Sequence, residues 1–272
     1  MSILNFRNVV LGFALVVVLS APSRADQLFD FNTPVQLGVA HDPGKWYTDR
    51  FAPYGFVSPL PSGSGILQQT INGGDFQANA FYNTQGRAYD VETGTLATQI
   101  SVFVDPTWTL AVNPPADGYT RFAGFWGITY SGASVTDPAD RTGYPIIEVV
   151  GDAGGFGVRT YDSETGAWSG VTSVTAGDTI SLGFSVSSTG LVSYFLNGSI
   201  LGSGYTLSEP TLGIGTVMLQ GHNYGNSYNI QWSGLSTSTS AVPEPASVVS
   251  AFIALGAAAA VAVGRARRPA TV

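Results

Sequence analysis

The sequence predicts an all-β protein built as an antiparallel β-sandwich. Apolar and small polar residues alternate in Ile180–Val186 and again in Val192–Leu196. This period of two places one face of each strand in a core. Gly-containing turn pairs recur at short intervals over residues 72–198, and we find no long segment with the apolar spacing of an amphipathic helix. Short strands separated by such turns are typical of a sandwich or barrel.

The clearest strands lie between residues 146 and 205. Ile146–Val150 and Phe156–Tyr161 flank a Gly-rich stretch and predict a hairpin. In 178–205, Ser188-Thr189-Gly190 and then Asn197-Gly198 turn the chain, because Asn and Gly tolerate the positive φ of tight hairpins. Three antiparallel strands in a meander are therefore expected there.

The two ends of the body are expected to meet. Leu28–Phe31 and Tyr228–Trp232 are apolar, strand-like segments near its start and its end. We expect them to be the first and last strands and to pair with each other.

The strand rhythm of residues 146–205, with its Ser/Thr-Gly turn and Tyr-Phe-Leu-Asn-Gly run, resembles the concanavalin A-like jelly roll. That fold is shared by laminin-G-like domains, lectins and some glucanases. The resemblance implies one sandwich domain over residues 26–235. It does not specify a function, since one fold hosts many activities.

The N-terminus has the layout of a secretory signal peptide. A short start containing Arg7 precedes the apolar run Val9–Leu19, and the small-x-small triplet Ser23-Arg24-Ala25 follows. Cleavage after a small residue completes the pattern. We predict a signal peptide over residues 1–25, cut between Ala25 and Asp26, so that the protein is exported.

The C-terminus predicts a linker and a membrane helix. The polar run at 236–242 is expected to be flexible. Residues 248–264 carry no charge over 17 residues. As a helix they would measure about 25 Å, against about 30 Å for a bilayer core. The arginines that follow would hold the C-terminus in the cytoplasm; they are Arg265, Arg267 and Arg268.

Pro243-Glu244-Pro245 precedes this helix. The two prolines keep the chain extended. Triplet, helix and arginines together, over 243–268, resemble the PEP-CTERM sorting signal of Gram-negative bacteria, also labelled "ice-binding protein C-terminal domain". The resemblance implies recognition by exosortase, a membrane-embedded transpeptidase-like enzyme, with Pro243, Glu244 and Pro245 as its motif. The protein would pass through the inner membrane to the cell surface or matrix. A simple membrane anchor is the alternative.

Charge excludes some partners. The chain has 11 basic and 18 acidic residues and no Cys. Five arginines and Glu244 lie in the two predicted end segments, which leaves 6 basic and 17 acidic residues and a net charge of −11 on the body. Such a body is repelled by nucleic acid and anionic lipid. Without Cys, no disulfide supports the fold.

For the body, we expect a non-enzymatic module that binds a glycan such as an exopolysaccharide, or a purely structural matrix protein. Aromatic side chains stack on sugar rings, and polar and Gly residues surround one set of aromatics and amides. The candidate glycan-binding residues are Trp126, Tyr130, His222, Asn223 and Tyr224.

A glycoside hydrolase or lyase on the same fold is the alternative. Retaining hydrolysis needs two carboxyl groups about 5 Å apart. The Glu-x-Asp-x-x-Glu run of the glucanases is absent, and the remaining candidates are Glu148 with Asp152 and Asp162 with Glu164. No metal or cofactor is expected, although acidic loops containing Asp137, Asp140 and Asp152 could attract Ca²⁺.

Overall fold

The computed structural model describes residues 26–77, 83–132 and 134–239. The predicted signal peptide (1–25), the sorting motif with its arginines and the predicted membrane helix (248–264) lie outside these ranges. Within them, no helix has the length and apolar character needed to cross a bilayer. The described helices are two single turns of 3-10 helix, η1 (Gly73–Asp75) and η2 (Pro138–Asp140).

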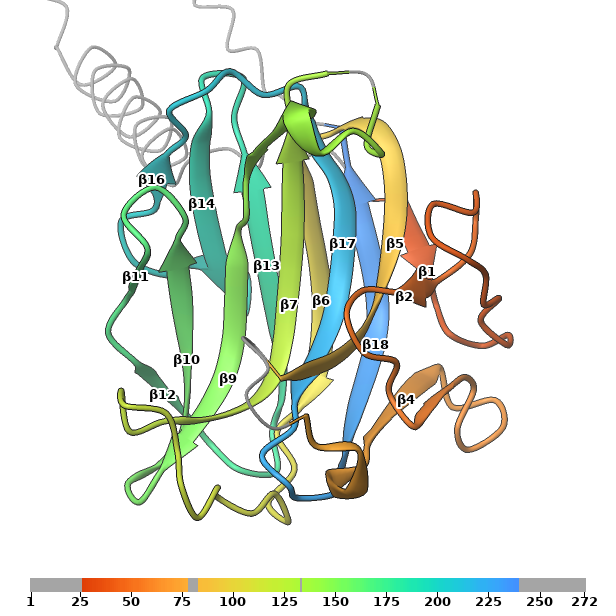
Figure 1. Cartoon of the computed structure of the whole chain (residues 1–272), viewed down its shortest axis with the longest axis vertical. Helices are drawn as coiled ribbons and strands as arrows, with labels where there is room; N and C mark the ends of the chain where they lie inside the picture. Colours follow the sequence, from red (N-terminus) through yellow and green to blue (C-terminus); the bar gives the residue numbers. More distant parts are fainter. Residues whose placement is uncertain (1–25, 78–82, 133, 240–272) are drawn as a thin grey trace, which may run out of the picture.

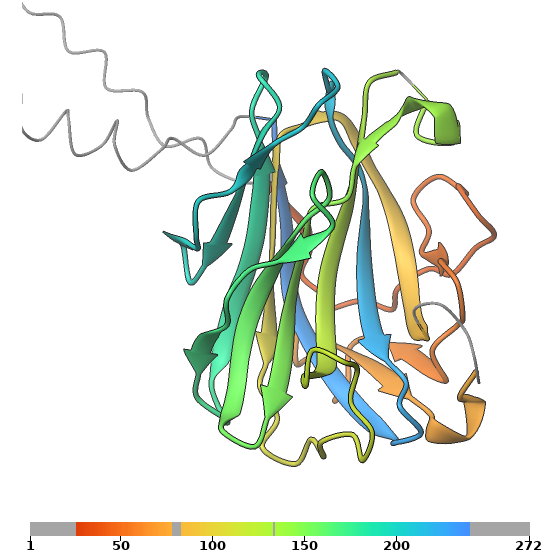
Figure 2. The ribbon, with the colours of Figure 1, turned by 60° about the vertical axis from the view of Figure 1, so that its left-hand side comes forward.

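The predicted all-β sandwich is confirmed: two antiparallel sheets pack face to face (Figures 1 and 2). The front sheet, nearest the viewer in Figure 1, runs in the order β11 (Ala167–Trp168), β10 (Gly155–Asp162), β9 (Ile146–Asp152), β7 (Thr120–Tyr130), β17 (Gly213–His222), β5 (Thr84–Thr95) and β2 (Tyr47–Thr48), with β12 (Thr172–Val174) beside β10 and β8 (Arg141–Gly143) beside β7.

The back sheet lies behind it and includes the first and last described strands. Its order is β15 (Ser199–Ile200), β14 (Leu191–Leu196), β13 (Thr179–Val186), β6 (Ala97–Phe103), β18 (Tyr228–Ser238), β4 (Ile66–Ile71) and β3 (Gly55–Val57), with β1 (Asp26–Phe29) beside β18 and β16 (Tyr205–Thr206) beside β14.

The main core fills the space between the two sheets. Phe125 of the front sheet and Phe184 of the back sheet meet with ring centroids 4.9 Å apart, and both are buried. Trp232 is fully buried, and its indole N–H donates to Gln69 Oε1 at 2.9 Å. Alternating apolar positions thus supply the core, while a polar pair inside it stays satisfied.

The predicted hairpin and the predicted meander are confirmed. β9 and β10 pair antiparallel around a turn at Ala153-Gly154, and β13, β14 and β15 form the expected meander. Asn197 and Gly198 adopt φ of 52° and 75°, the left-handed values that a tight hairpin requires.

The first and last strands do pair, but the last strand does so through residues beyond the expected 228–232. β1 runs beside β18 with Phe29 opposite Leu235, Gln27 opposite Ser236 and Asp26 opposite Thr237. The linker prediction for 236–242 is therefore wrong at its start, because Ser236–Ser238 belong to β18 and bond to β6 as well. The polar side chains of these residues are compatible with a strand that is hydrogen-bonded to a neighbouring strand on each side.

Candidate functional site

The outer face of the front sheet, the face turned away from the back sheet, carries a second cluster of apolar side chains. Strands β7 and β17 are buried along their whole length, on both faces. A sheet face left to solvent would show alternating exposure. Trp126, Tyr130 and Met218 pack on this outer face, separately from the main core.

Strand register aligns most of this cluster into one row across the sheet. Directly opposed residues of antiparallel strands point to the same face. Successive pairings across all seven strands of the main order give the row Trp168, Tyr161, Ile146, Trp126, Met218, Ala88 and Tyr47. With strands spaced by about 4.8 Å, the row extends roughly 29 Å perpendicular to the strands.

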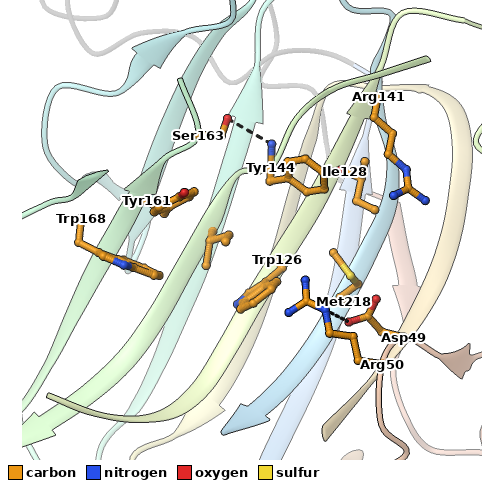
Figure 3. A pocket seen from close by; sticks show the side chains of 11 residues that line it. Asp49, Arg50, Trp126, Ile128, Arg141, Tyr144, Tyr161, Ser163, Trp168 and Met218 are labelled. Atoms are coloured by element: carbon orange, nitrogen blue, oxygen red, sulfur yellow. Dashed lines mark hydrogen bonds and ion pairs between the residues drawn. The ribbon is translucent and has the colours of Figure 1, made fainter. Parts of the chain in front are cut away.

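A hollow of about 350 Å³ lies over the row from its Trp168 end to Met218 (Figure 3). This volume is within the range of small-ligand pockets. Trp168 and Tyr161 stand at one end of it, Trp126 lies in the middle, and Arg50, Arg141 and Asp49 stand at the other end (Figure 3). Tyr144 and Ser163 also line it. The hollow therefore combines stacking surfaces with hydrogen-bonding and charged groups.

Two glycines shape the floor beside the row. A Cβ added at Gly124 would lie 2.5 Å from Trp126 Nε1, and one added at Gly86 would lie 2.2 Å from Gln220 Oε1. Both glycines face outward in the polar row next to the apolar one, where Gly124 and Gly86 each stand opposite Gln220. Glycine at these two positions leaves room for the indole and the amide to lie against the sheet.

A buried ion network lies beside the Trp168 end. Arg159 donates from Nε to Glu148 Oε1 at 2.9 Å and from Nη1 to Asp117 Oδ2 at 2.8 Å. Arg121 approaches Glu148 Oε1 at 3.4 Å. Burial raises the pKa of Glu148, and the two guanidinium groups oppose that rise. Trp168 covers the network, with its ring centroid 4.1 Å from the Arg159 guanidinium carbon and 4.9 Å from that of Arg121.

His222 joins this network as a neutral imidazole. Its side chain is largely buried, and the nearby Arg121 adds to the effect of burial, so that its pKa falls to about 3. Arg121 Nη1 lies 3.3 Å from His222 Nε2, which suits an unprotonated acceptor nitrogen. The ring of Tyr224 stacks on the imidazole with centroids 4.9 Å apart.

A second polar cluster closes the other end of the row. Asp90 accepts hydrogen bonds from Tyr47 OH at 2.7 Å and from Thr216 Oγ1 at 3.0 Å. His41 Nδ1 lies 2.8 Å from the other oxygen of Asp90. Burial and the nearby Asp90 carboxylate raise the pKa of Tyr47, so its hydroxyl remains a donor. The hydroxyl of Tyr130 lies 3.4 Å from Thr216 Oγ1 and extends the cluster.

The sequence-predicted site residues separate into three groups. Trp126 lines the hollow. Tyr130, His222 and Tyr224 lie on or beside the same face but take part in the polar clusters. Asn223 is fully buried; its amide donates to the Asn72 carbonyl and accepts from Gly225 N, so it holds a loop in place.

Sequence reasoning missed most of the hollow. Tyr161 and Trp168 come from β10 and β11, and Arg50 and Arg141 from near β2 and from β8. Only strand register brings them beside Trp126. The signal that could have found Tyr161 is the predicted β9–β10 hairpin, which places it opposite Ile146.

The acidic residues considered for hydrolysis or calcium mostly serve turns. Asp152 accepts from Gly154 N, Asp162 from Glu164 N, and Asp137 from Ala139 N. Among residues 26–77, 83–132 and 134–239, no three His, Cys, Asp or Glu side chains gather as metal ligands would. Glu148 alone of the candidates belongs to the outer face.

No known protein family matches the sequence, and no curated protein is similar to it in sequence. Solved structures do share the sandwich. An endo-β-galactosidase from Clostridium perfringens that releases GlcNAcα1-4Gal has a TM-score of 0.50 at 10% identity, over 80% of this chain and 63% of that chain. A sialidase has a TM-score of 0.46 at 9% identity, over 80% of this chain and 18% of the sialidase. The carbohydrate-binding module CBM66 from Bacillus subtilis has a TM-score of 0.38 at 10% identity, over 71% of this chain and 95% of the module. At such identities the likeness shows the fold.

The expectation of a non-enzymatic body is contradicted by one of these matches. The endo-β-galactosidase is an enzyme on this kind of sandwich. A sandwich of this kind can therefore carry an enzyme. The absence of the Glu-x-Asp-x-x-Glu run of the glucanases does not exclude catalysis, because one fold can carry catalytic groups at different positions.

Proposed function

We propose that the chain binds a glycan along the apolar row on the outer face of the front sheet. The observation that carries this is the register-aligned row of aromatic and apolar side chains beneath a 350 Å³ hollow. Sugar rings present apolar faces that stack on aromatic side chains, while their hydroxyls need polar partners. Tyr161 and Trp168 supply the aromatic surfaces, and Asp49 and Ser163 supply the polar partners.

The site has room for more than one sugar ring. A second hollow of about 280 Å³ shares Trp168 with the first and continues over the sheet edge toward Tyr205 and Asp162. Trp168 therefore stands between two hollows. A chain-like ligand lying across the strands fits this arrangement better than a compact one.

Cleavage of the bound glycan is the second candidate. Glu148 and Asp117 both bond to the single guanidinium of Arg159, which brings two carboxyl groups close together beside the hollow. Paired carboxyl groups about 5 Å apart are the requirement of retaining glycosidases. For either carboxyl group to act on a sugar, Arg159 and the Trp168 ring above it have to move aside.

A glycan array with the purified full-length chain, followed by a reducing-sugar assay on the glycans that bind, tests both candidates. Binding without release of reducing ends supports the first candidate alone. Release that is lost in Glu148→Gln, with binding kept, supports the second. An array on which no glycan binds contradicts both.

We further propose that export and sorting bring this site outside the cell. The support is the sequence pattern of the two ends: a signal peptide over 1–25 and the Pro243-Glu244-Pro245 tail with its arginines. An exosortase-type enzyme is the proposed partner, and the membrane helix holds the intermediate. A body with a net charge of −11 suits such a location, since it resists non-specific adhesion to nucleic acid.

A further inference from the structure

The outer face concentrates the cations of an acidic protein. The body has 6 basic and 17 acidic residues. Arg50 and Arg141 line the hollow, and Arg121 and Arg159 lie beneath Trp168 on the same face. Four of the six basic side chains therefore gather on one face of one sheet.

Two of these four arginines are already neutralised. Arg159 bonds to both Glu148 and Asp117, and Arg121 lies 3.4 Å from Glu148 and 4.0 Å from Asp117. The two guanidinium and two carboxylate charges cancel. This network positions Trp168 but supplies no excess charge.

The hollow itself keeps an excess of positive charge. Its lining contains Arg50 and Arg141 but one carboxylate, Asp49. Asp49 Oδ2 accepts from Gln220 Nε2 at 2.7 Å and lies 3.9 Å from Arg50 Nε. Arg141 forms no ion pair with any residue of the described ranges. Its guanidinium hydrogen-bonds to Tyr144 and Tyr130, and with five N–H donors it keeps others for a ligand.

We infer that the glycan bound in this hollow carries a carboxylate, as in a uronic acid or sialic acid chain, and that Arg141, with Arg50 beside it, binds that carboxylate. The inference rests on the proposed glycan-binding function. Figure 3 shows the arginines at the end of the hollow opposite Tyr161 and Trp168. A glycan chain with one ring stacked at the aromatic end can thus present the acid group of a further ring at the guanidinium end. A planar guanidinium matches a carboxylate with two parallel hydrogen bonds.

The alternative is a neutral glycan that hydrogen-bonds to these arginines. Charge complementarity favours the acidic glycan, because the lining carries two guanidinium groups and one carboxylate. The net negative charge of the rest of the body repels a polyanion, so an acidic glycan is expected to bind at this face selectively.

The test is a titration of the full-length chain with two matched probes: an oligomer of a uronic acid, chosen from the array, and the same oligomer with its carboxyl groups reduced to primary alcohols. The wild type is expected to bind the acidic oligomer at least tenfold more tightly, with affinity falling as salt rises. Arg141→Gln is expected to lose that tenfold preference while binding the reduced oligomer as before.

Arg87→Gln is the matched control. Arg87 stands opposite Leu219, which belongs to the main core, so it is on the front sheet but not on the outer face. Its substitution is expected to leave the preference unchanged. Arg50→Gln, at a half-exposed side chain, provides a second variant if Arg141→Gln does not fold.

Equal binding of the two oligomers by the wild type, or an unchanged preference in a folded Arg141→Gln, overturns the inference and leaves the glycan-binding proposal standing. Tighter binding of neutral array glycans than of all acidic ones does the same. If the wild type binds no array glycan at all, the proposed function fails, and this inference fails with it.

Discussion

The guanidinium carbon of Arg159 lies 4.1 Å from the ring centroid of Trp168, so the aromatic wall of the hollow rests on a buried ion pair. Arg159 and Glu148 side chains are each 2% exposed. A stacked cation of this kind fixes the ring as well as contributing attraction. The stability of the sheet and the shape of the hollow are thus linked through one residue.

Replacement of Arg159 by Met is expected to lower the free energy of unfolding by about 3–5 kcal/mol, because Glu148 loses its closest partner while buried. Urea unfolding followed by tryptophan fluorescence measures the change. Arg50→Met, at a side chain 39% exposed, is the control and is expected to cost about 0–1 kcal/mol. If the two variants unfold alike, the ion pair does not stabilise the sheet.

His222 is expected to make the fold sensitive to acid. Its pKa is about 3 when folded and about 6.5 in an unfolded chain, so the unfolded state binds more protons between these values. This group therefore does not lower the free energy of unfolding above pH 6.5. As the pH drops from 6.5 toward 3, it lowers that free energy by about 1.4 kcal/mol per pH unit.

The pH dependence is measured by urea unfolding of the wild type and of His222→Gln at several values between pH 4 and 7. The difference between the two proteins isolates the histidine from Glu148, whose raised pKa acts in the opposite direction. Parallel curves for the wild type and His222→Gln would show that the imidazole is not held neutral by the fold.

Gly124→Ala is expected to weaken glycan binding. The added Cβ would lie 2.5 Å from Trp126 Nε1, so the indole has to leave its place on the floor of the hollow. We expect a loss of affinity of about tenfold, equivalent to about 1.4 kcal/mol. Gly170→Ala is the control, because a Cβ there meets nothing within 4 Å. Titration with the best glycan from the array measures both, and equal affinities would remove Trp126 from the site.

Changing Pro243, Glu244 and Pro245 together to Ala is expected to block processing of the tail. Intact mass and fractionation from the native cell measure the outcome. The proposal expects a shortened wild-type protein outside the inner membrane and a full-length variant within it. Should both proteins remain full-length in the membrane, the tail is an anchor and the body is tethered.

Sequence patterns predicted the local elements of the fold and few of its long-range contacts. Alternation in Ile180–Val186 and the Asn197-Gly198 turn act over a few residues, and both were confirmed. The pairing of β1 with β18 was predicted, but its register was not, since register depends on the partner strand. The polar composition of Ser236–Ser238 predicted a linker. The segment is a strand instead, because it pairs with β1 and β6, which are distant in the sequence.

In the candidate site too, the sequence predicted what local neighbours determine and missed what sheet order determines. Trp126 was chosen because polar and Gly residues surround it, and Gly124 does create its place. Trp168 and Arg141 were not chosen, because each lies in a two- or three-residue strand that only sheet order places beside Trp126. Asn223 was chosen for its polarity, yet it is fully buried, where an amide serves the backbone.

The most direct test of glycan binding at the outer face is a calorimetric titration of the best array glycan into wild type and Trp168→Ala, with Tyr54→Ala as control. Trp168 stands between the two hollows, whereas Tyr54 is 75% exposed and lines neither. The account predicts that Trp168→Ala loses at least tenfold in affinity while Tyr54→Ala binds as the wild type does. A folded Trp168→Ala that binds with wild-type affinity would contradict it.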